Sequence, residues 1–323
     1  MKVAVTGGSG VVGRAVIAHL VAEGHHVSAL ARSAGSADIV ETLGAQPVSG
    51  DVLDRPSLDA LVADAGWVFN IAGINELCPA DPDGMDTVNI EGTRNVIHAA
   101  RAAGARRLIH TSSAVTIGER QGTVGTEVSP HRGSYLSRYE RSKHLSESVL
   151  FDEAGALEVV AVNPSSVQGP GRDTGTGKLI LDVLNGRLPF LVESRVSIVD
   201  IDDCAKGHHL AAERGVPGER YILSGPSFDI RTALELLRQV TGRDLDPRFL
   251  PGWVANFGAG AAEVGARVIG RRPKLCKEML RVMLAGHSYD GSKATRDLGL
   301  VYTPFEVTIR RTIEWFEGEG LLT

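Results

Sequence analysis

The sequence predicts an α/β fold, a doubly wound parallel sheet followed by a smaller and irregular C-terminal lobe. Over the first 165 residues, short β-rich runs alternate with amphipathic stretches of helix length, which is the pattern of right-handed βαβ units. The β-rich runs are almost continuously apolar, as is typical of strands buried on both faces. After Pro164 the alternation loosens and prolines recur as far as Pro304, which indicates the irregular lobe.

The expected strands share a high content of Val, Ile, Leu and Ala and end in polar or glycine residues. They cover residues 2–6, 27–32, 46–51, 67–72, 107–112 and 158–163. The expected helices carry apolar residues at helical spacing and end close to a glycine. They cover residues 11–23, 55–64, 85–103 and 134–153. Strand and helix therefore follow one another in the order that a doubly wound sheet requires.

Composition excludes several classes of protein. The chain has 323 residues, 43% of them apolar and 23% charged, which is typical of a globular protein of about two folding units. Its net charge of −5 lacks the positive field of a nucleic-acid binder. Three cysteines, an odd number without a C-x-x-C pair, make a disulfide scaffold or a cysteine zinc site unexpected.

No membrane segment or metal site is expected. No hydrophobic signal segment precedes the first strand, and the small-apolar stretch 253–270 is too short and too polar to cross a bilayer. The histidine pairs 25–26 and 208–209 lack the i, i+4 spacing that directs two ligands at one metal. We therefore expect a cytoplasmic protein without a membrane or nucleic-acid partner.

A glycine-rich turn, T-G-G-S-G-V-V-G at residues 6–13, joins the first strand to the first helix. Gly7 allows the tight turn, Gly10 lets backbone N–H groups approach a pyrophosphate, and Gly13 lets the helix pack closely on the strand. Because the turn lies directly between a strand and a regular helix, it predicts dinucleotide binding rather than a merely structural turn.

This turn assigns roles to the two parts of the chain. Residues 1–165 are expected to form a dinucleotide-binding Rossmann domain, to which segments of about 195–224 return. Residues 166–323 are expected to form mainly a substrate-binding lobe.

The end of the second strand favours NADP, although NAD remains possible. An acidic residue there would bind an adenosine ribose diol, but the strand ends Leu-Ala-Arg-Ser at residues 30–33. The guanidinium of Arg32 suits a 2′-phosphate, unless it is simply a solvated surface group. Asp51 and Val52 end the third strand, where the adenine edge is expected, and the alternative role of this segment is to cap the next helix.

A candidate catalytic pair lies in the helix expected at 134–153. Tyr139 and Lys143 are four residues apart and therefore share one helix face. A free tyrosine with a pKa near 10 is a poor base, but a lysine cation and an oxidised nicotinamide both stabilise the phenolate. The run His-Thr-Ser-Ser at 110–113 ends the fifth strand, at the sheet edge where such folds bind ligands, and a serine hydroxyl there can donate to a substrate carbonyl.

With these residues the chain resembles the extended short-chain dehydrogenase/reductase family over essentially its whole length. It looks closest to the branch of dihydroflavonol-4-reductase-like and 3β-hydroxysteroid-dehydrogenase-like proteins and related sugar epimerases. The matching features are the glycine turn, Asn70-Ile71-Ala72-Gly73, Asn89-Ile90-Glu91-Gly92-Thr93, Ser113, Tyr139 with Lys143, Asn163-Pro164, the run Val199–Asp203, Asp290-x-Ser292-Lys293-Ala294 and Pro304-Phe305.

The resemblance implies a role for each motif residue. Tyr139 would be the acid/base, Lys143 would bind the nicotinamide ribose and lower the tyrosine pKa, and Ser113 would orient the carbonyl. The implied cofactor contacts are Gly7, Gly10, Val11, Val12, Gly13, Arg32, Asp51, Val52, Ala72, Tyr139, Lys143, Asn163 and Pro164. Family members are often homodimers, and the helices at 85–103 and 134–153 would then form the interface.

Three functions remain open. The first choice is a reductase that transfers hydride between nicotinamide C4 and a ketone or aldehyde, or the corresponding alcohol. The second is a nucleotide-sugar epimerase with tightly bound NAD, for which Arg172, Lys178 and Arg195 could bind a diphosphate or could be solvated charges. The third is a non-catalytic dinucleotide sensor. A sugar-nucleotide dehydratase is excluded, because Ala114 and Val115 follow Ser113 where that class has Asp-Glu.

Two further features of the lobe have both a functional and an ordinary interpretation. Six apolar residues of the lobe could line an apolar substrate pocket or could simply belong to the hydrophobic core. They are Phe190, Trp253, Phe257, Leu275, Met279 and Met283. The segment 267–281 holds six basic residues and one acid, which indicates a solvated helix face or a patch that meets an anionic substrate or partner.

Overall fold

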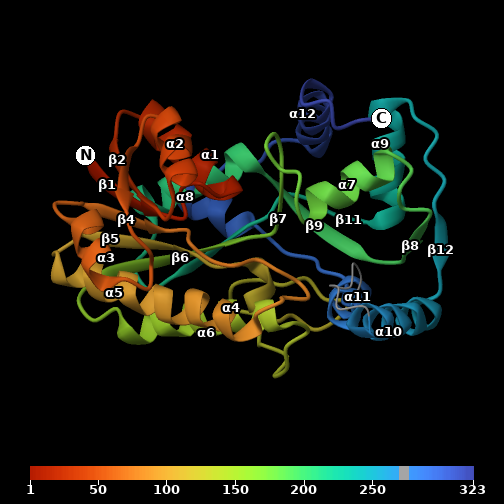
Figure 1. The fold of residues 1–323 in the computed structure, drawn as a ribbon, viewed down its shortest axis with the longest axis horizontal. Helices are drawn as coiled ribbons and strands as arrows, with labels where there is room; N and C mark the ends of the chain where they lie inside the picture. The colour runs from red at the N-terminus through yellow and green to blue at the C-terminus, as the bar shows by residue number, and fades with distance from the viewer. Residues whose placement is uncertain (269–275) are drawn as a thin grey trace.

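The computed structural model describes residues 1–268 and 276–323, and its centre is a seven-stranded parallel sheet (Figure 1). The strands are β1 (Lys2–Thr6), β2 (His26–Ala31), β3 (Gln46–Ser49), β4 (Trp67–Asn70), β5 (Arg107–Thr111), β6 (Glu158–Pro164) and β10 (Arg220–Leu223). Their order is β10-β6-β5-β4-β1-β2-β3, and every pairing is parallel. The order reverses at β1, and such a switch point opens a crevice at the carboxyl ends of the strands.

Helices cover both faces of this sheet, as Figure 1 shows. One face carries α1 (Val11–Ala22), α2 (Ala34–Thr42) and α8 (Ile201–Arg214), and the other carries α3 (Arg55–Val62), α5 (Gly92–Ala102) and α6 (Arg138–Glu153). Each face buries its own apolar cluster against the strands. Because both faces are buried, the strand sequences are almost continuously apolar. The predicted doubly wound α/β fold is thus confirmed.

Most predicted elements agree with the structure to within a few residues, with three differences. Helix α2 was not predicted, because it is short, rich in small and polar residues, and fully buries only Val40. The expected helix at 85–103 is a chain of α4 (Pro82–Asp86), the π-helical turn η1 (Thr87–Glu91) and α5. Helix α6 begins at Arg138 rather than 134, because the Ser137 hydroxyl caps it by accepting from the Glu140 N–H.

The C-terminal lobe is built on two small sheets. One has the order β11-β9-β7 and the other pairs β12 with β8. Their strands are β7 (Ser166–Gln168), β8 (Phe190–Val192), β9 (Arg195–Asp200), β11 (Ser227–Asp229) and β12 (Arg248–Leu250). The helical elements are α7 (Thr176–Leu184), α9 (Ile230–Thr241), α10 (Gly252–Val268), α11 (Lys277–Ala285), η3 (Ala294–Leu298) and α12 (Phe305–Gly318). Of the segment around 195–224, β10 lies in the large sheet and α8 packs on it, whereas β9 belongs to the lobe.

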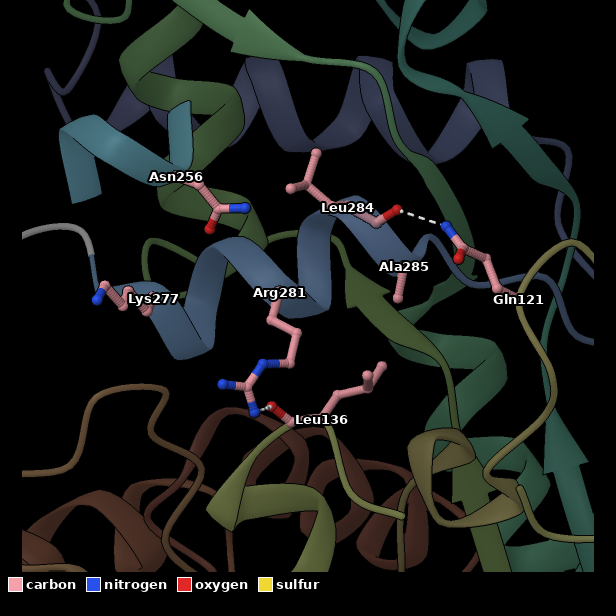
Figure 2. Close-up of a pocket in the computed structure, with 7 residues that line it drawn as sticks. All are labelled: Gln121, Leu136, Asn256, Lys277, Arg281, Leu284 and Ala285. Carbon is pink, nitrogen blue, oxygen red and sulfur yellow. Dashed lines mark hydrogen bonds between the residues drawn. The ribbon is translucent and has the colours of Figure 1, made fainter. Parts of the chain in front are cut away.

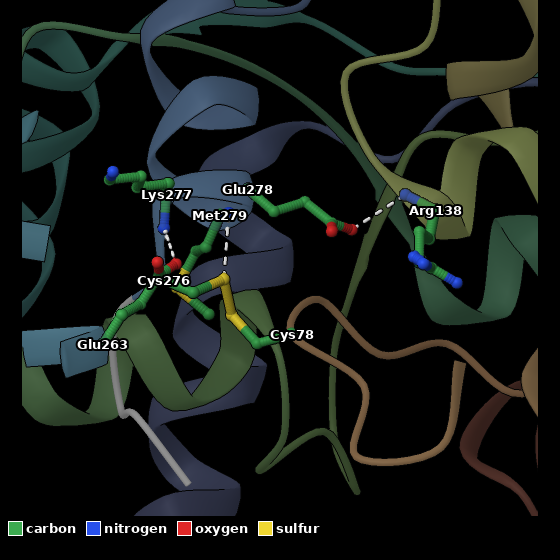
Figure 3. The surroundings of a disulfide bond; sticks show 7 residues. All are labelled: Cys78, Arg138, Glu263, Cys276, Lys277, Glu278 and Met279. Carbon is green, nitrogen blue, oxygen red and sulfur yellow. Dashed lines mark hydrogen bonds between the residues drawn. A yellow bond between two sulfur atoms is a disulfide. The ribbon is translucent and has the colours of Figure 1, made fainter. Parts of the chain in front are cut away.

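A disulfide joins Cys78, in the loop after β4, to Cys276 at the start of α11 (Figure 3). The cysteine pattern, which made a disulfide scaffold unexpected, did not predict this single disulfide. The two residues are 198 positions apart, and only the packing of α11 beside the large domain brings them together. Cys204 remains a buried free thiol. Among the helices that the structure describes, none is long and apolar enough to span a membrane.

Candidate active site

The turn between β1 and α1 forms a glycine cradle. Gly7 has a φ of +70°, which strains other residues, and a Cβ there would lie 2.6 Å from the Ala72 nitrogen. A Cβ on Gly13 would lie 2.1 Å from the Gly7 oxygen, so only glycine permits this close packing. The N-cap of α1 is Gly10, which has no side chain to occupy the N–H groups of Val11 and the residues after it. The cradle therefore fits the pyrophosphate of a dinucleotide.

Polar side chains link the ends of β1, β4 and β5 beside this cradle. The Thr6 hydroxyl donates to Asn70 Oδ1 at 2.8 Å and accepts from the Ala72 N–H at 3.2 Å. The Asn70 amide lies 3.2 Å from Nδ1 of His110. Burial lowers the pKa of His110 well below its usual value, so the imidazole is neutral. These contacts fix the three strand ends that form the floor of the crevice.

The proposed adenosine contacts lie at the ends of β2 and β3. The Arg32 side chain is 71% exposed, and its Nη1 lies 3.8 Å from Oδ2 of Asp51, so the guanidinium is available to a ligand. Asp51 also accepts from the Leu53 N–H at 2.9 Å. Helix α3 is capped by Asp54 and not by Asp51. Val52 is buried below these groups.

Tyr139 and Ser113 meet at the carboxyl end of β5. Tyr139 lies in the first turn of α6, and Ser113 directly precedes the short 3-10 helix η2 (Ala114–Ile117). Burial raises the pKa of the Tyr139 phenol, while a hydrogen-bonding interaction with Ser113 and the nearby charge of Arg172 lower it. In the absence of a nicotinamide charge the phenol is therefore protonated at neutral pH.

Lys143 lies one helical turn after Tyr139 and points at the same strand end. Its Nζ donates to the Thr111 oxygen at 2.7 Å, and a Cβ on Gly73 would lie 3.8 Å from it. Burial lowers the pKa of Lys143 to about 8, and the carboxylate of Glu147 opposes this shift. The loop after β4 therefore packs against the glycine cradle at Ala72 and passes near the lysine at Gly73.

Asn89 ties that loop to α6. Its Oδ1 accepts from the Ile74 N–H at 2.7 Å, and its Nδ2 donates to the Ile74 oxygen and to Ser142 Oγ at 3.0 and 2.8 Å. Asn89 is completely buried. It therefore holds the loop between the cradle and α6 in one place.

Glu147 and Asn163 form a second buried network, beneath Ser113. The Asn163 amide donates to Glu147 Oε2 at 2.6 Å, to Thr116 Oγ1 at 3.0 Å and to the Ser113 oxygen at 3.3 Å. Arg220 lies 3.1 Å from the other carboxylate oxygen of Glu147. This network fixes the backbone of Ser113. Asn163 and Pro164, both expected at the cofactor, end β6 and are buried.

The lobe residues considered for a substrate occupy different environments. Arg172 lies close enough to Tyr139 for its charge to favour the phenolate form, and burial lowers the pKa of its guanidinium. Lys178 pairs with Asp182 on α7, and Arg195 is exposed. Phe190, Trp253 and Phe257 are exposed, and Met279 and Met283 are half-buried. Leu275 and part of the basic segment 267–281 lie outside the described residues.

Three residues of this site were missed by the sequence reasoning. Glu147 lies one turn after Lys143 on the same helix, so the i, i+4 spacing was an available signal. Asn89 belongs to a recognised motif but had no assigned role. His208 was treated as half of an adjacent pair, yet its Nε2 lies 2.8 Å from Thr111 Oγ1, and no local pattern indicates this contact. Within the described ranges no cluster of three potential ligands is arranged to hold a metal ion.

Comparison with known proteins shows which family the chain resembles. The model of the NAD dependent epimerase/dehydratase family matches residues 3–224. A candidate dihydroflavonol 4-reductase of Synechocystis sp. is 30% identical, over 98% of this chain and 94% of the other. Sterol demethylase protein B of Methylococcus capsulatus is 29% identical over the full length of both. A 2-alkyl-3-oxoalkanoate reductase of Stenotrophomonas maltophilia is 28% identical, over 93% and 94%.

Solved structures agree with this assignment. The structure of gox2253 superposes with a TM-score of 0.87 at 32% identity, over 100% of this chain and 99% of the other. The UDP-glucuronic acid 4-epimerase of Bacillus cereus, solved with UDP-glucuronic acid and NAD, shares the fold with a TM-score of 0.78 at 21% identity, over 99% and 100%. The extent of the family match and the full-length similarity lead to one conclusion: this chain belongs to the NAD dependent epimerase/dehydratase family.

Proposed function

We propose that the protein is an NADP-dependent oxidoreductase that reduces a ketone or aldehyde to an alcohol. The observation that carries the proposal is the convergence of Ser113, Tyr139 and Lys143 at the end of β5, beside the loop after β4 that packs against the glycine cradle. Relatives named as reductases of oxo compounds support it. The neutral phenol suits a proton donor, which reduction of a carbonyl requires.

Each residue has a defined task in this reaction. NADPH, when bound, supplies the hydride that the carbonyl carbon receives. Ser113 donates a hydrogen bond to the carbonyl oxygen and stabilises the negative charge that develops there. Tyr139 gives its proton to that oxygen, and the Lys143 cation stabilises the phenolate that remains. In the alcohol-to-ketone direction the same phenolate accepts the proton.

The proposed cofactor contacts are the cradle and the ends of three strands. The cradle residues Gly7, Gly10 and Gly13 would hold the pyrophosphate, and Arg32 would pair with the 2′-phosphate of NADP. Lys143 would bind the nicotinamide ribose. These residues surround one edge of the large sheet, which is where open α/β sheets bind ligands.

A nucleotide-sugar epimerase is the second candidate, and Arg172 is the observation that favours it. Its guanidinium interacts with Tyr139, and its buried Nε has no hydrogen-bond partner among the described residues. A cation beside the acid/base could contact a sugar nucleotide. Against this candidate, an epimerase retains its cofactor, whereas the exposed Arg32 suits an NADP that exchanges at each turnover.

Identification of the nucleotide in the purified protein distinguishes the two. Bound nucleotide is released by denaturing one portion of the protein and is identified by chromatography. A second, native portion is titrated with NADPH and NADH. The reductase proposal expects an empty or freely exchanging site that prefers NADPH, followed by NADPH oxidation with a panel of ketones and aldehydes. Retained NAD together with turnover of UDP-sugars would instead establish the epimerase.

A further inference from the structure

A cationic pocket lies between the C-terminal lobe and the start of α6. Its volume is about 320 Å³, which falls within the range of small-molecule sites (Figure 2). Its polar lining consists of Lys277 and Arg281 from α11, Asn256 from α10, and Gln121. Leu136, three residues before Tyr139, forms the opposite wall. No acidic side chain is among these lining residues.

The two cations of this pocket lack local compensation. Lys277 and Arg281 are four residues apart on α11, a spacing at which like charges repel each other. Neither side chain forms an ion pair with a described residue. Glu263 and Glu278 bond to backbone instead, accepting from the Lys277 N–H at 2.6 Å and from the Arg138 N–H at 2.8 Å. The only hydrogen bond recorded for the Arg281 guanidinium within the described ranges is a long one, 3.5 Å to the Leu136 oxygen.

Residues 269–275, which lie outside the described ranges, contain no aspartate or glutamate, so they hold no carboxylate that could neutralise this pair. A pocket lined by two cations, two carboxamides and no acid is therefore complementary to an anion, which would also relieve the repulsion along α11.

Three contacts hold α11 against the loop after β4 and the start of α6. The Cys78–Cys276 disulfide attaches its N-terminus to the loop after β4, and Cys276 Sγ also accepts from the Met279 N–H (Figure 3). Glu278 binds the first residue of α6, and Arg281 reaches Leu136. Three residues of chain span at most about 11 Å, so the pocket wall lies within that distance of the Tyr139 backbone.

We propose that this pocket binds a carboxylate or phosphate group of the molecule whose carbonyl is reduced at Tyr139. The inference rests on the proposed reductase function and adds a substrate class to it, carbonyl compounds that carry an anionic group at a distance from the carbonyl. Lys277 and Arg281 neutralise the anion and act on substrate binding, not on the hydride or proton transfers.

Keto acids and their neutral methyl esters test this directly. The probes are 4-oxopentanoate, 7-oxooctanoate and 10-oxoundecanoate, each compared with its ester under NADPH. At the chain length that spans the two sites, we expect the acid to have the lower KM. Arg281→Gln and Lys277→Gln should each raise the KM of that acid about tenfold, as for a lost charge-assisted contact, while kcat and the KM of the ester stay unchanged.

Lys206→Gln is the matched control, because Lys206 is an exposed lysine on α8, remote in sequence from the pocket. Lys206→Gln should change the KM of neither the keto acid nor its ester. Turnover of the ester by each variant shows that the fold and the catalytic residues are intact. Equal KM values for acid and ester at every length, or equal effects of Arg281→Gln on both, would overturn the proposal while the reductase function stands.

A protein that reduces neither probe contradicts the reductase function, and binding then tests the pocket by itself. Binding is measured by calorimetric titration of 7-oxooctanoate and of inorganic phosphate into the full-length protein. The two probes distinguish a carboxylate site from a phosphate site. The pocket is supported when Arg281→Gln abolishes binding that Lys206→Gln retains. It is refuted when wild type binds neither probe or when both variants bind equally.

Discussion

Lys143 donates from Nζ to the backbone oxygen of Thr111 at 2.7 Å, and the hydroxyl of the same threonine lies 2.8 Å from Nε2 of His208. Thr111 is thus the point where α6, β5 and α8 are joined. Nδ1 of His208 lies 2.7 Å from the Cys204 oxygen and must donate to it, so Nε2 accepts from the threonine. The lysine is therefore held by a buried polar chain that crosses the sheet.

Glu147 is expected to set the pH at which Lys143 loses its charge. Burial lowers the lysine pKa to about 8 and Glu147 raises it, so reductase activity should fall as the pH rises through about 8. Glu147→Gln keeps the shape of the side chain but removes the negative charge, which should move this fall to lower pH. The pH profile of kcat/KM measures the shift, with Glu153→Gln at the far end of α6 as the control. An unchanged profile in Glu147→Gln would show that Lys143 does not titrate in this way.

His208 is expected to make the fold sensitive to acid. Burial lowers its pKa to about 4, below the usual 6.5, so the unfolded state binds more protons between those two values. The stability that its neutral form contributes is complete above pH 6.5 and is lost as the pH falls toward 4, with about 2 kcal/mol gone by pH 5.

Urea unfolding at pH 7 and pH 5 tests this expectation. His208→Asn should lower the free energy of unfolding at pH 7. It should also reduce the amount of this free energy that is lost between pH 7 and pH 5. His26→Asn, at an exposed position, should leave the loss as in wild type. An equal loss in wild type and in His208→Asn would contradict the assignment.

Arg32 is expected to select between the two nicotinamide cofactors. Arg32→Ala should weaken NADPH by about 1.5–3 kcal/mol, because it removes a charge-assisted contact to the 2′-phosphate, and should leave NADH nearly unchanged. Fluorescence titration with both cofactors measures this. Arg106→Ala, at another exposed arginine, should affect neither. Equal weakening of both cofactors by Arg32→Ala would remove the reason for choosing NADP.

The disulfide is expected to stabilise the contact between α11 and the large domain. It closes a loop of 198 residues, and such links typically contribute about 2–4 kcal/mol. Cys78→Ser and Cys276→Ser should therefore lower the free energy of unfolding by similar amounts. A dithiol reductant should destabilise wild type but neither variant. Peptide mapping without reductant that finds both thiols free would contradict the pairing.

The sequence was sufficient to predict the features that depend on local pattern. The strand–helix alternation and the glycine turn follow from residues close together in the chain, and so does the helical spacing of Tyr139 and Lys143. The disulfide could not be predicted in this way, because its cysteines meet only through the packing of α11 on the large domain. The same holds for the bond of His208 to Thr111, which joins residues 97 positions apart.

The cationic pocket was likewise only partly predictable from local sequence. Residues 267–281 stand out in the sequence as basic, but a basic stretch alone does not distinguish a solvated helix face from a binding site. The difference comes from where Glu263 and Glu278 direct their carboxylates, which only the folded chain determines.

Tyr139→Phe tests the central claim most directly. The variant keeps the ring but removes the hydroxyl that we propose gives its proton to the substrate oxygen. Single-turnover oxidation of NADPH by a ketone substrate, followed in stopped flow, should slow by roughly 10²-fold or more, while NADPH affinity stays nearly that of wild type. Tyr135→Phe, four residues earlier, should retain the wild-type rate. Wild-type turnover by Tyr139→Phe would show that Tyr139 is not the acid/base of this enzyme.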